Sequence, residues 1–376
     1  MDITKVLLTI IAGFCVFIIG CGIPTPREMT VEFSRECFAT LVNTLSEDGG
    51  DFDSDNIVSN EAGYLHVKHG LEYFGVQGGV YIGVGPDQNF TYIAQIKPRY
   101  AFILDIRRDN LIEHLVYKAI FALAETRAEF LSLLFSKPLS ALLLKTDNPS
   151  ILEMIAYFDR TPGRLELYRS NLKRIQKKLQ TYGIGLTNED HLRVTELYQA
   201  FYDRHLDLRW EYRSDGSRGI SFITYRSFLL GRDLEGSLGN FLNNDEDYQF
   251  IKEMQARNGI IPITGDFAGN HSLKSIGRYV RARGDRISAF YLSNVEYYLH
   301  PDDLMDEFAE NIRHLPTDNR SMLIRAFVNV GNATHPKQVD RQLMTTILQY
   351  TRSFSQLFAD GAYPSYIDLG VKDYMQ

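Results

Sequence analysis

Short apolar runs, each followed directly by glycine, serine or aspartate, constrain the fold of this chain more than any other feature. There are five of them, at residues 79–82, 100–104, 260–264, 287–292 and 322–330. Stretches with apolar residues at helical spacing, such as 273–283 and 302–314, lie between them. Short, continuously apolar strands that alternate with helices are typical of a parallel sheet buried on both faces. We therefore expect an α/β fold with a doubly wound, mostly parallel sheet.

The periodicity changes between the second and third runs. From Asn110 onward, apolar residues recur every three or four positions, which favours helices. Residues 111–255 are therefore expected to form a large, mainly helical insertion after strand 2, with one strand-like run at 219–225. Residues 57–110 and 256–376 are expected to form the Rossmann-like domain. A long helix is expected over residues 337–358.

The first 21 residues have the pattern of an export signal. Lys5 precedes an apolar run at 6–20, and Gly20 precedes Cys21. The run is shorter than the roughly 20 residues that a membrane-spanning helix needs, and it is typical of a signal-peptide core. Its end resembles the lipobox of bacterial lipoproteins, which implies cleavage after residue 20 and lipidation of Cys21. An uncleaved N-terminal anchor in the inner membrane and a buried helix remain alternatives.

Residues 21–56 are expected to form a tether and an N-terminal helix. By resemblance to enterobacterial lipoproteins, Gly22 after the cysteine implies the outer membrane in a host that has one. Cleavage and lipidation would leave Cys37 as the one unmodified thiol, so neither a disulfide nor a cysteine-rich zinc site is expected. His66 and His69 are three residues apart, but no third ligand is evident, so no metal is expected. The net charge of −7 argues against nucleic-acid binding.

Residues suited to ligand binding stand at four of the predicted strand ends. Ligands of open parallel sheets bind beyond the carboxyl ends of the strands, near the point where the strand order reverses. Glycines let a ligand approach the backbone closely, because they lack a Cβ atom. A carboxylate can accept hydrogen bonds from a ribose diol. The residues are Gly83, Gly85, Asp105, Asp266 and Asn294.

This ordered set resembles the class I S-adenosylmethionine-dependent methyltransferases. Residues 80–86 are similar to the first motif of that family, a strand that runs into Gly-x-Gly. The resemblance implies S-adenosylmethionine as cofactor, with Asp105 on the ribose and Asp266 beside the adenine. It covers roughly residues 79–110 and 260–330 and leaves the helical insertion outside.

The chain also departs from the family pattern. Tyr81 stands where the family usually has an acidic residue, and Asp87 replaces the third glycine. Asp87 either holds the amino group of the ligand or caps the helix that begins near Gln88. After strand 4, Asn294, Glu296 and Tyr297 are the candidates for contacting the methyl acceptor. The alternative is that they open the following helix.

Two functions follow from these patterns. The first is a membrane-anchored methyltransferase-like enzyme that transfers a methyl group to an unknown small-molecule or protein acceptor, with the helical insertion as a substrate cap. The second is a non-catalytic exported lipoprotein, for binding or scaffolding, that retains the fold without a cofactor. Export favours the second, because the periplasm is not expected to supply S-adenosylmethionine. In both, the protein belongs to the cell envelope and contacts the membrane through its N-terminal lipid or anchor.

Overall fold

The computed structural model describes residues 31–375, except 53, 142, 144–147, 212–221 and 332. The predicted signal peptide, the predicted lipidation site Cys21 and the start of the expected tether lie outside the described residues. Within the described part of the chain, no helix combines the length and the apolar character that crossing a bilayer requires.

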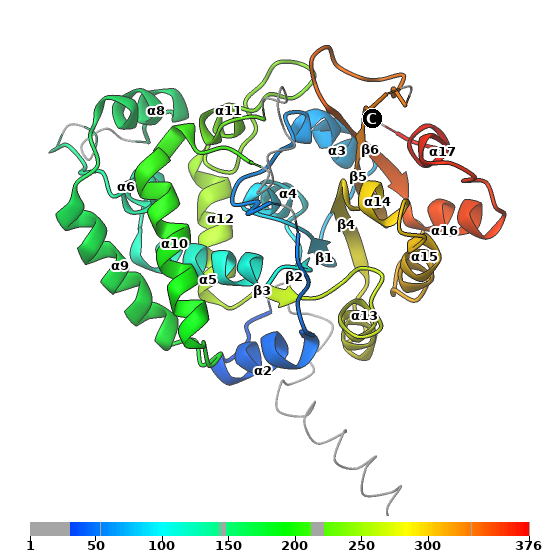
Figure 1. Ribbon diagram of the computed structural model, residues 1–376, viewed down its shortest axis with the longest axis horizontal. Coiled ribbons are helices and arrows are strands. Elements are labelled where there is room, and N and C mark those ends of the chain that lie inside the picture. Colours follow the sequence, from blue (N-terminus) through cyan, green and yellow to red (C-terminus); the bar gives the residue numbers. More distant parts are fainter. Residues whose placement is uncertain are drawn as a thin grey trace, which may run out of the picture.

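A six-stranded mixed sheet forms the centre of the molecule (Figure 1). Its strands are β1 (Val80–Gly83), β2 (Tyr100–Asp105), β3 (Ile260–Thr264), β4 (Ile287–Ser293), β5 (Met322–Val328) and β6 (Met344–Tyr350). The spatial order is β3-β2-β1-β4-β5-β6; β1 to β5 are parallel, and β6 is antiparallel to β5. The expected α/β fold with a mostly parallel sheet is confirmed. Because β1 lies between β2 and β4, the strand order reverses at β1.

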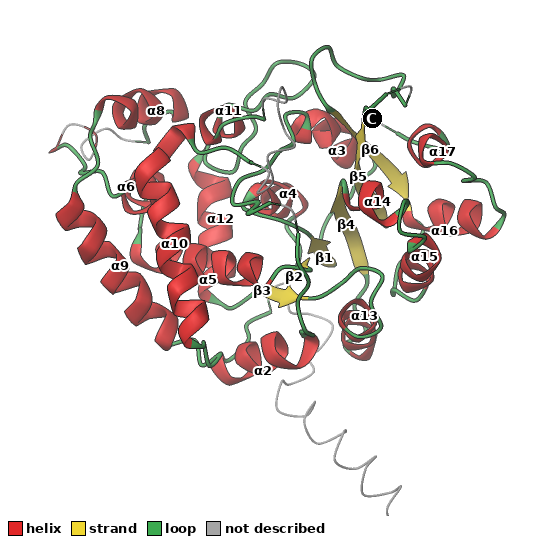
Figure 2. Ribbon diagram, in the orientation of Figure 1, coloured by secondary structure: helices red, strands yellow, loops and turns green. Residues whose placement is uncertain are grey.

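Helices cover both faces of the sheet (Figure 2). One face carries α4 (Gln88–Ile96) and α5 (Arg108–Leu123), and near β6 it carries η1 (Tyr64–Val67) and α3 (Lys68–Tyr73). The other face carries α2 (Arg35–Leu45), α13 (Ser272–Ala282), α15 (Met305–Arg313) and α16 (Thr351–Ala359). Every residue of β1, β2, β3 and β5 is buried, as expected for parallel strands covered on both faces.

The chain between β2 and β3 is mainly helical and gathers on one side of the sheet (Figure 1). After α5 it forms α6 (Arg127–Phe135), α8 (Ile151–Arg160), α9 (Leu165–Gln180), α10 (Asn188–Arg204), η2 (His205–Asp207), α11 (Tyr225–Leu229) and α12 (Asp245–Ala256). Thr126, Ser150 and Thr187 start three of these helices with capping boxes. Since α5 packs against β2 and β3, the layer that covers the sheet extends into this helical block.

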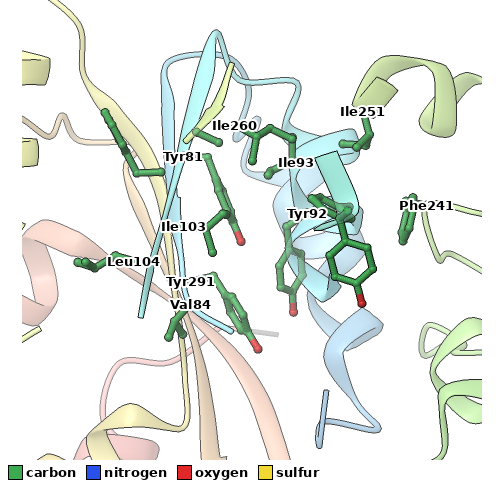
Figure 3. Close-up of a cluster of buried hydrophobic side chains, with 14 of the residues drawn as sticks. Tyr81, Val84, Tyr92, Ile93, Ile103, Leu104, Phe241, Ile251, Ile260 and Tyr291 are labelled. Carbon is green, nitrogen blue, oxygen red and sulfur yellow. The ribbon is translucent and has the colours of Figure 1, made fainter. Parts of the chain in front are cut away.

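Part of the hydrophobic core lies between the sheet and α4 (Figure 3). Tyr81 of β1 and Tyr291 of β4 face Tyr92 of α4, and the ring centroids of Tyr92 and Tyr291 are 5.0 Å apart. Phe241 and Ile251 close the far side of α4. The tyrosines bury large apolar rings, but each hydroxyl still needs a hydrogen-bond partner, so this core contains polar contacts.

The strand β6 corrects a prediction. Residues 337–358 were expected to form one helix, but Met344–Tyr350 is a strand and only Thr351–Ala359 is helical. Thr345, Thr346 and Ile347 are β-branched, and all three are buried against neighbouring elements. The backbone hydrogen bonds of β6 are made with β5, so the sequence of residues 344–350 alone does not reveal the strand. At the described end of the strand expected at 219–225, Thr224 forms an isolated antiparallel bridge with Arg209 and is the N-cap of α11, so the prediction is wrong at Tyr225, where the helix begins.

Two short helices, α14 (Val295–Leu299) and α17 (Tyr366–Val371), complete the described part of the chain. At the other end, Ser34 caps α2 by accepting a hydrogen bond from the backbone N–H of Cys37. Cys37 is buried and takes part in a disulfide in the full-length chain, whereas no disulfide was expected for the cleaved and lipidated chain.

Candidate functional site

A cavity of about 340 Å³ opens at the carboxyl ends of β1, β2, β3 and β4. This is the edge of the sheet at which the strand order reverses, and ligands of doubly wound sheets bind there. The strand ends supply Val84 to Pro86, Asp105 to Arg107, Gly265 to Phe267 and Ser293 to Val295. Trp210 of the helical block lines it from another side, as do Asp51, Phe52, Asn56, Ser59 and Asn60 of the loop before η1.

The turn after β1 is shaped by Asn89 of α4. Its amide nitrogen donates hydrogen bonds to the carbonyl oxygens of Val84, Gly85 and Pro86 at 2.8–3.1 Å. Its oxygen accepts one from the Tyr81 hydroxyl at 2.9 Å. Tyr81, which departs from the methyltransferase pattern, therefore helps to fix the glycine turn.

The two glycines of this turn have different surroundings. Gly85 lines the cavity and has a φ of +79°, a conformation that glycine adopts at little cost. Gly83 is not among the residues that line it. A Cβ atom at Gly83 would lie 1.9 Å from Asn89 Oδ1 and 2.7 Å from the Tyr81 hydroxyl. Gly83 therefore makes room for Tyr81 and Asn89 rather than for a ligand.

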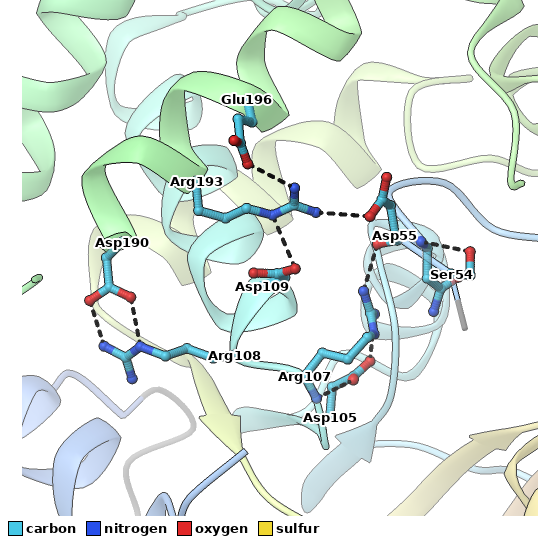
Figure 4. Close-up of polar contacts among 10 residues, drawn as sticks. Ser54, Asp55, Asp105, Arg107, Arg108, Asp109, Asp190, Arg193 and Glu196 are labelled. Carbon is cyan, nitrogen blue, oxygen red and sulfur yellow. Dashed lines mark hydrogen bonds and ion pairs between the residues drawn. The ribbon is translucent and has the colours of Figure 1, made fainter. Parts of the chain in front are cut away.

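The end of β2 carries a buried ion pair (Figure 4). Asp105 accepts hydrogen bonds from the Arg107 guanidinium at Oδ2 and from the Arg107 backbone N–H at Oδ1, each at 2.9 Å. Arg107 also donates to the Asp55 carbonyl at 2.6 Å and so holds the loop over the cavity. Each Asp105 oxygen has a second lone pair, so the carboxylate keeps acceptor capacity toward the cavity.

Asp105 and Asp266 lie close together. Asp105 pairs in register with Thr264, and the Gly265 N–H donates to the Asp105 carbonyl at 2.8 Å. Asp266 follows directly, is half-buried and lines the same cavity. Its Oδ1 accepts the Ala268 N–H at 2.9 Å, and this turn holds the carboxylate at the end of β3.

Strand β4 ends with two irregularities. Its register against β5 shifts between Tyr291 and Ser293, and Ser293 has a φ of +52°. Bulges and left-handed conformations of residues other than glycine are costly, and they often occur beside functional sites. Here they place Ser293 and Asn294 on the cavity wall.

The other two residues expected after β4 point elsewhere. Glu296 pairs with Arg325 of β5 at 2.8 Å, and both side chains are buried. Tyr297 packs against the rings of Tyr298 and Tyr366. Neither Glu296 nor Tyr297 is among the residues that line the cavity. Tyr298, one position further on, lines it instead and contacts the ring of Phe52.

A buried carboxylate behind this wall was not predicted. Glu61 accepts hydrogen bonds from the Tyr291 hydroxyl at 2.6 Å, from Ser293 Oγ and from Gln88 Nε2. Burial raises the pKa of Glu61, although its three hydrogen bonds oppose the shift. Tyr291 and Ser293 line the cavity, so they connect it to Glu61. Glu61 stands in a loop far from β4 in sequence, and no local pattern marks it.

Asp87 lies beneath the turn rather than in the cavity. It is fully buried, and its Oδ2 accepts a hydrogen bond from the Tyr225 hydroxyl at 2.7 Å. Its side chain forms no cap hydrogen bond with α4, so the expected capping role is not confirmed. Burial raises the pKa of Asp87 to about 7. Nearby, His114 Nε2 donates to the Gly85 carbonyl at 2.8 Å, and burial lowers its pKa to about 4.

Among the charged residues of the described cavity lining, most are carboxylates. Asp51, Asp105, Asp266 and Asp302 line it, against the single guanidinium of Arg107. The apolar part of the lining includes five aromatic residues, Phe52, Trp210, Phe267, Tyr291 and Tyr298, beside the aliphatic side chains of Val84, Pro86, Ile106, Val295, Leu299 and Leu304. Such a lining suits a flat aromatic ligand with hydroxyl groups and positive charge, and it disfavours phosphates.

The fold and this cavity define a protein of the α/β class that fits the Rossmann-like type, with a candidate ligand site at the reversal point of its sheet. A family model described as "Domain of unknown function (DUF7790)" matches residues 56–201 and 219–372. The match covers most of the chain, so the protein belongs to this family. It includes all six strands and the strand ends that line the cavity. A comparison with curated proteins gave no match.

Proposed function

We propose that the cavity binds S-adenosylmethionine and that the protein is a methyltransferase-like enzyme. The observation that carries this proposal is the convergence of Gly85, Asp105, Asp266 and Asn294 on one cavity at the reversal point of the sheet. Four strand ends, widely separated in sequence, contribute these residues. Their order along the chain is the order that the methyltransferase resemblance requires.

The charge of the cavity supports this choice of ligand. S-adenosylmethionine carries a sulfonium and an ammonium group against one carboxylate, so its net charge is positive. The carboxylates of the lining favour such a ligand over a nucleotide phosphate. In the proposed pose, the ribose hydroxyls donate to Asp105, the adenine lies near Asp266 and Phe267, and the methionine end lies near Gly85.

The acceptor side of the proposed site lies at Ser293 and Asn294. Methyl transfer from a sulfonium needs mainly alignment and exclusion of water. A base is needed only where the acceptor must lose a proton. The Ser293 hydroxyl lines the cavity and donates to Glu61, so a proton from an acceptor hydroxyl would pass through Ser293 Oγ to Glu61. Trp210 lines the cavity from the helical block, which supports a role for that block as an inserted substrate cap.

A second function, a non-catalytic lipoprotein for binding or scaffolding, is favoured by two observations. Gly83 is closed off by Tyr81 and Asn89, and both oxygens of Asp105 already accept hydrogen bonds from Arg107. The export pattern of residues 1–21 also favours the non-catalytic function. In either case we propose that the protein is anchored in the cell envelope through lipidated Cys21, or through an uncleaved N-terminal helix.

Thermal denaturation with and without ligand separates the two functions. A ligand present at 100 times its dissociation constant stabilises the folded state by about 2.7 kcal/mol. We expect both S-adenosylmethionine and its demethylated product to raise the melting temperature of the protein. We expect Asp105→Ala to abolish this increase, measured against the ligand-free variant. Asp318→Ala, at the opposite edge of the sheet before β5, is the matched control and should retain it. No increase at millimolar ligand favours the non-catalytic function.

A further inference from the structure

Three side chains that can bind a metal ion, His69, Asp233 and Glu235, lie close together, and none of them lines the cavity. His69 lies on α3, and Asp233 and Glu235 lie on the turn that precedes Leu238. One ligand atom from each of the three lies within 4.8 Å of the others. The sequence showed His66 and His69 but no third ligand. The fold brings the missing carboxylates from more than 150 positions further along the chain.

The distances match a small coordination sphere. His69 Nε2 lies 2.9 Å from Glu235 Oε2 and 3.4 Å from Asp233 Oδ2. Zinc binds nitrogen and oxygen at about 2.0–2.2 Å in tetrahedral geometry, which sets neighbouring ligand atoms about 3.4 Å apart. The three side chains therefore need only small adjustments to share one ion.

The second, independent observation is an unsatisfied oxygen. The side chain of Asp233 is 1 % exposed, and its Oδ2 has no hydrogen-bond partner among the described residues. A buried carboxylate oxygen that accepts no hydrogen bond is costly, and the one ion pair that it forms among the described residues is with His69 Nε2, 3.4 Å away, so the position suits a bound cation. This oxygen is the one that faces His69.

The surrounding contacts hold the ligands in place. Asp233 Oδ1 accepts the Ser237 N–H at 2.8 Å and the Glu235 N–H at 3.2 Å. Gly236, with a φ of +84°, allows the tight turn that carries Asp233 and Glu235. On the far side of the imidazole, His69 Nδ1 lies 3.6 Å from Glu72 Oε2. Partners of this kind orient metal ligands in known sites.

We propose that His69, Asp233 and Glu235 form a binding site for a divalent transition metal of the zinc type. The imidazole nitrogen argues against calcium and magnesium, which take oxygen ligands. Three protein ligands leave a fourth position for water. The ion would join α3 to the 233–236 turn and so fasten the segment before α12 to α3. This proposal does not depend on the proposed function.

Zinc titration of the chelator-treated, full-length protein tests the proposal. By calorimetry we expect one zinc ion per chain, and Co²⁺ in place of zinc should give the visible absorption of a tetrahedral complex. His69→Gln and Glu235→Gln change half-exposed side chains and are not expected to disturb folding. Each should weaken zinc binding by more than about 10-fold, because loss of groups that only orient metal ligands already weakens binding about 10- to 100-fold.

A second exposed histidine provides the matched control. His314 Nδ1 lies 3.2 Å from Glu310 Oε1 and forms an ion pair with no other carboxylate of the described residues. His314→Gln should leave zinc binding and the cobalt spectrum unchanged. The proposal is overturned if the protein shows no saturable zinc binding, in which case His69 is only ion-paired. It is also overturned if His69→Gln and His314→Gln bind zinc equally well.

Discussion

Arg107 donates two hydrogen bonds to Asp105, one from its guanidinium and one from its backbone N–H, each 2.9 Å long. Both side chains are 4 % exposed, so the pair is buried at the wall of the cavity. Asp105, the carboxylate expected to bind a ribose, therefore also neutralises the positive charge of Arg107. Any ligand at the end of β2 must use the remaining lone pairs of Asp105.

This pair makes a prediction about stability. Arg107→Met leaves the buried Asp105 carboxylate without its cation, so we expect the free energy of unfolding to fall by about 3 kcal/mol. The double variant Asp105→Asn with Arg107→Met removes both charges and should lose less than the sum of the two single variants. Urea denaturation of the four proteins measures this coupling. Additive losses would show that the pair does not interact.

The raised pKa of Asp87 predicts that the stability of the folded protein depends on pH. Its pKa is about 7 in the folded protein and 3.8 in the reference state, so the folded state favours the protonated carboxyl. The resulting stabilisation is complete below about pH 3.8 and is lost as the pH rises to about 7, because only the unfolded chain ionises readily in that window. Each unit of pKa shift corresponds to about 1.4 kcal/mol, which sets the loss at about 4 kcal/mol at most.

The test compares Asp87→Asn with the wild type. The variant cannot ionise, and its side-chain oxygen can still accept the Tyr225 hydroxyl. Its stability relative to the wild type should therefore increase between pH 4 and pH 7, measured by urea denaturation. Asp340→Asn, at an exposed position, should show no such trend. Parallel pH curves for the wild type and Asp87→Asn would mean that Asp87 is ionised in the folded protein.

Substitutions at Glu296 and Asn294 are predicted to affect different properties, stability in the first case and ligand binding in the second. Glu296→Gln leaves buried Arg325 without its ion-pair partner and should lower the free energy of unfolding by about 3 kcal/mol. Asn294→Ala should change stability little and should weaken ligand binding, because Asn294 lines the cavity. Denaturation and ligand-shift measurements on both variants distinguish these outcomes. Glu310→Gln, in an exposed ion pair, is the control for loss of a surface charge.

Anchoring through Cys21 is tested by metabolic labelling. Cells that express the full-length protein should incorporate labelled palmitate or glycerol into it, and Cys21→Ala should abolish the incorporation. Ser34→Ala, at the N-cap of α2, is the control and should retain it. Membrane association without label in the wild type would instead support an uncleaved N-terminal helix.

The parallel strands could be predicted from the sequence because each is a short apolar run that ends in a turn residue. The run at 260–264 coincides with β3, the run at 79–82 is offset from β1 by one residue at both ends, and the other three differ from the observed strands by one or two residues at one end. Strand β6 could not be predicted in this way, because its residues are compatible with either a helix or a strand until they pair with β5. The helical character of the chain between β2 and β3 was also predictable from its periodicity.

Only part of the candidate site followed from the sequence. Gly85, Asp105, Asp266 and Asn294 line the cavity because residues that follow parallel strands meet at one edge. Gly83, Asp87, Glu296 and Tyr297 do not, since the direction of each side chain depends on partners distant in sequence, such as Asn89, Tyr225 and Arg325. For the same reason, Glu61 and the carboxylates beside His69 could be found only from the fold.

The most direct test of the central claim is calorimetric titration of S-adenosylmethionine into the full-length protein. We expect saturable binding at one site per chain, with loss of binding in Gly85→Val, which places a branched side chain at a positive φ on the cavity wall. Circular dichroism shows whether that variant is folded. Absence of binding at millimolar ligand to the folded wild-type protein would contradict the claim and leave an anchored, non-catalytic protein.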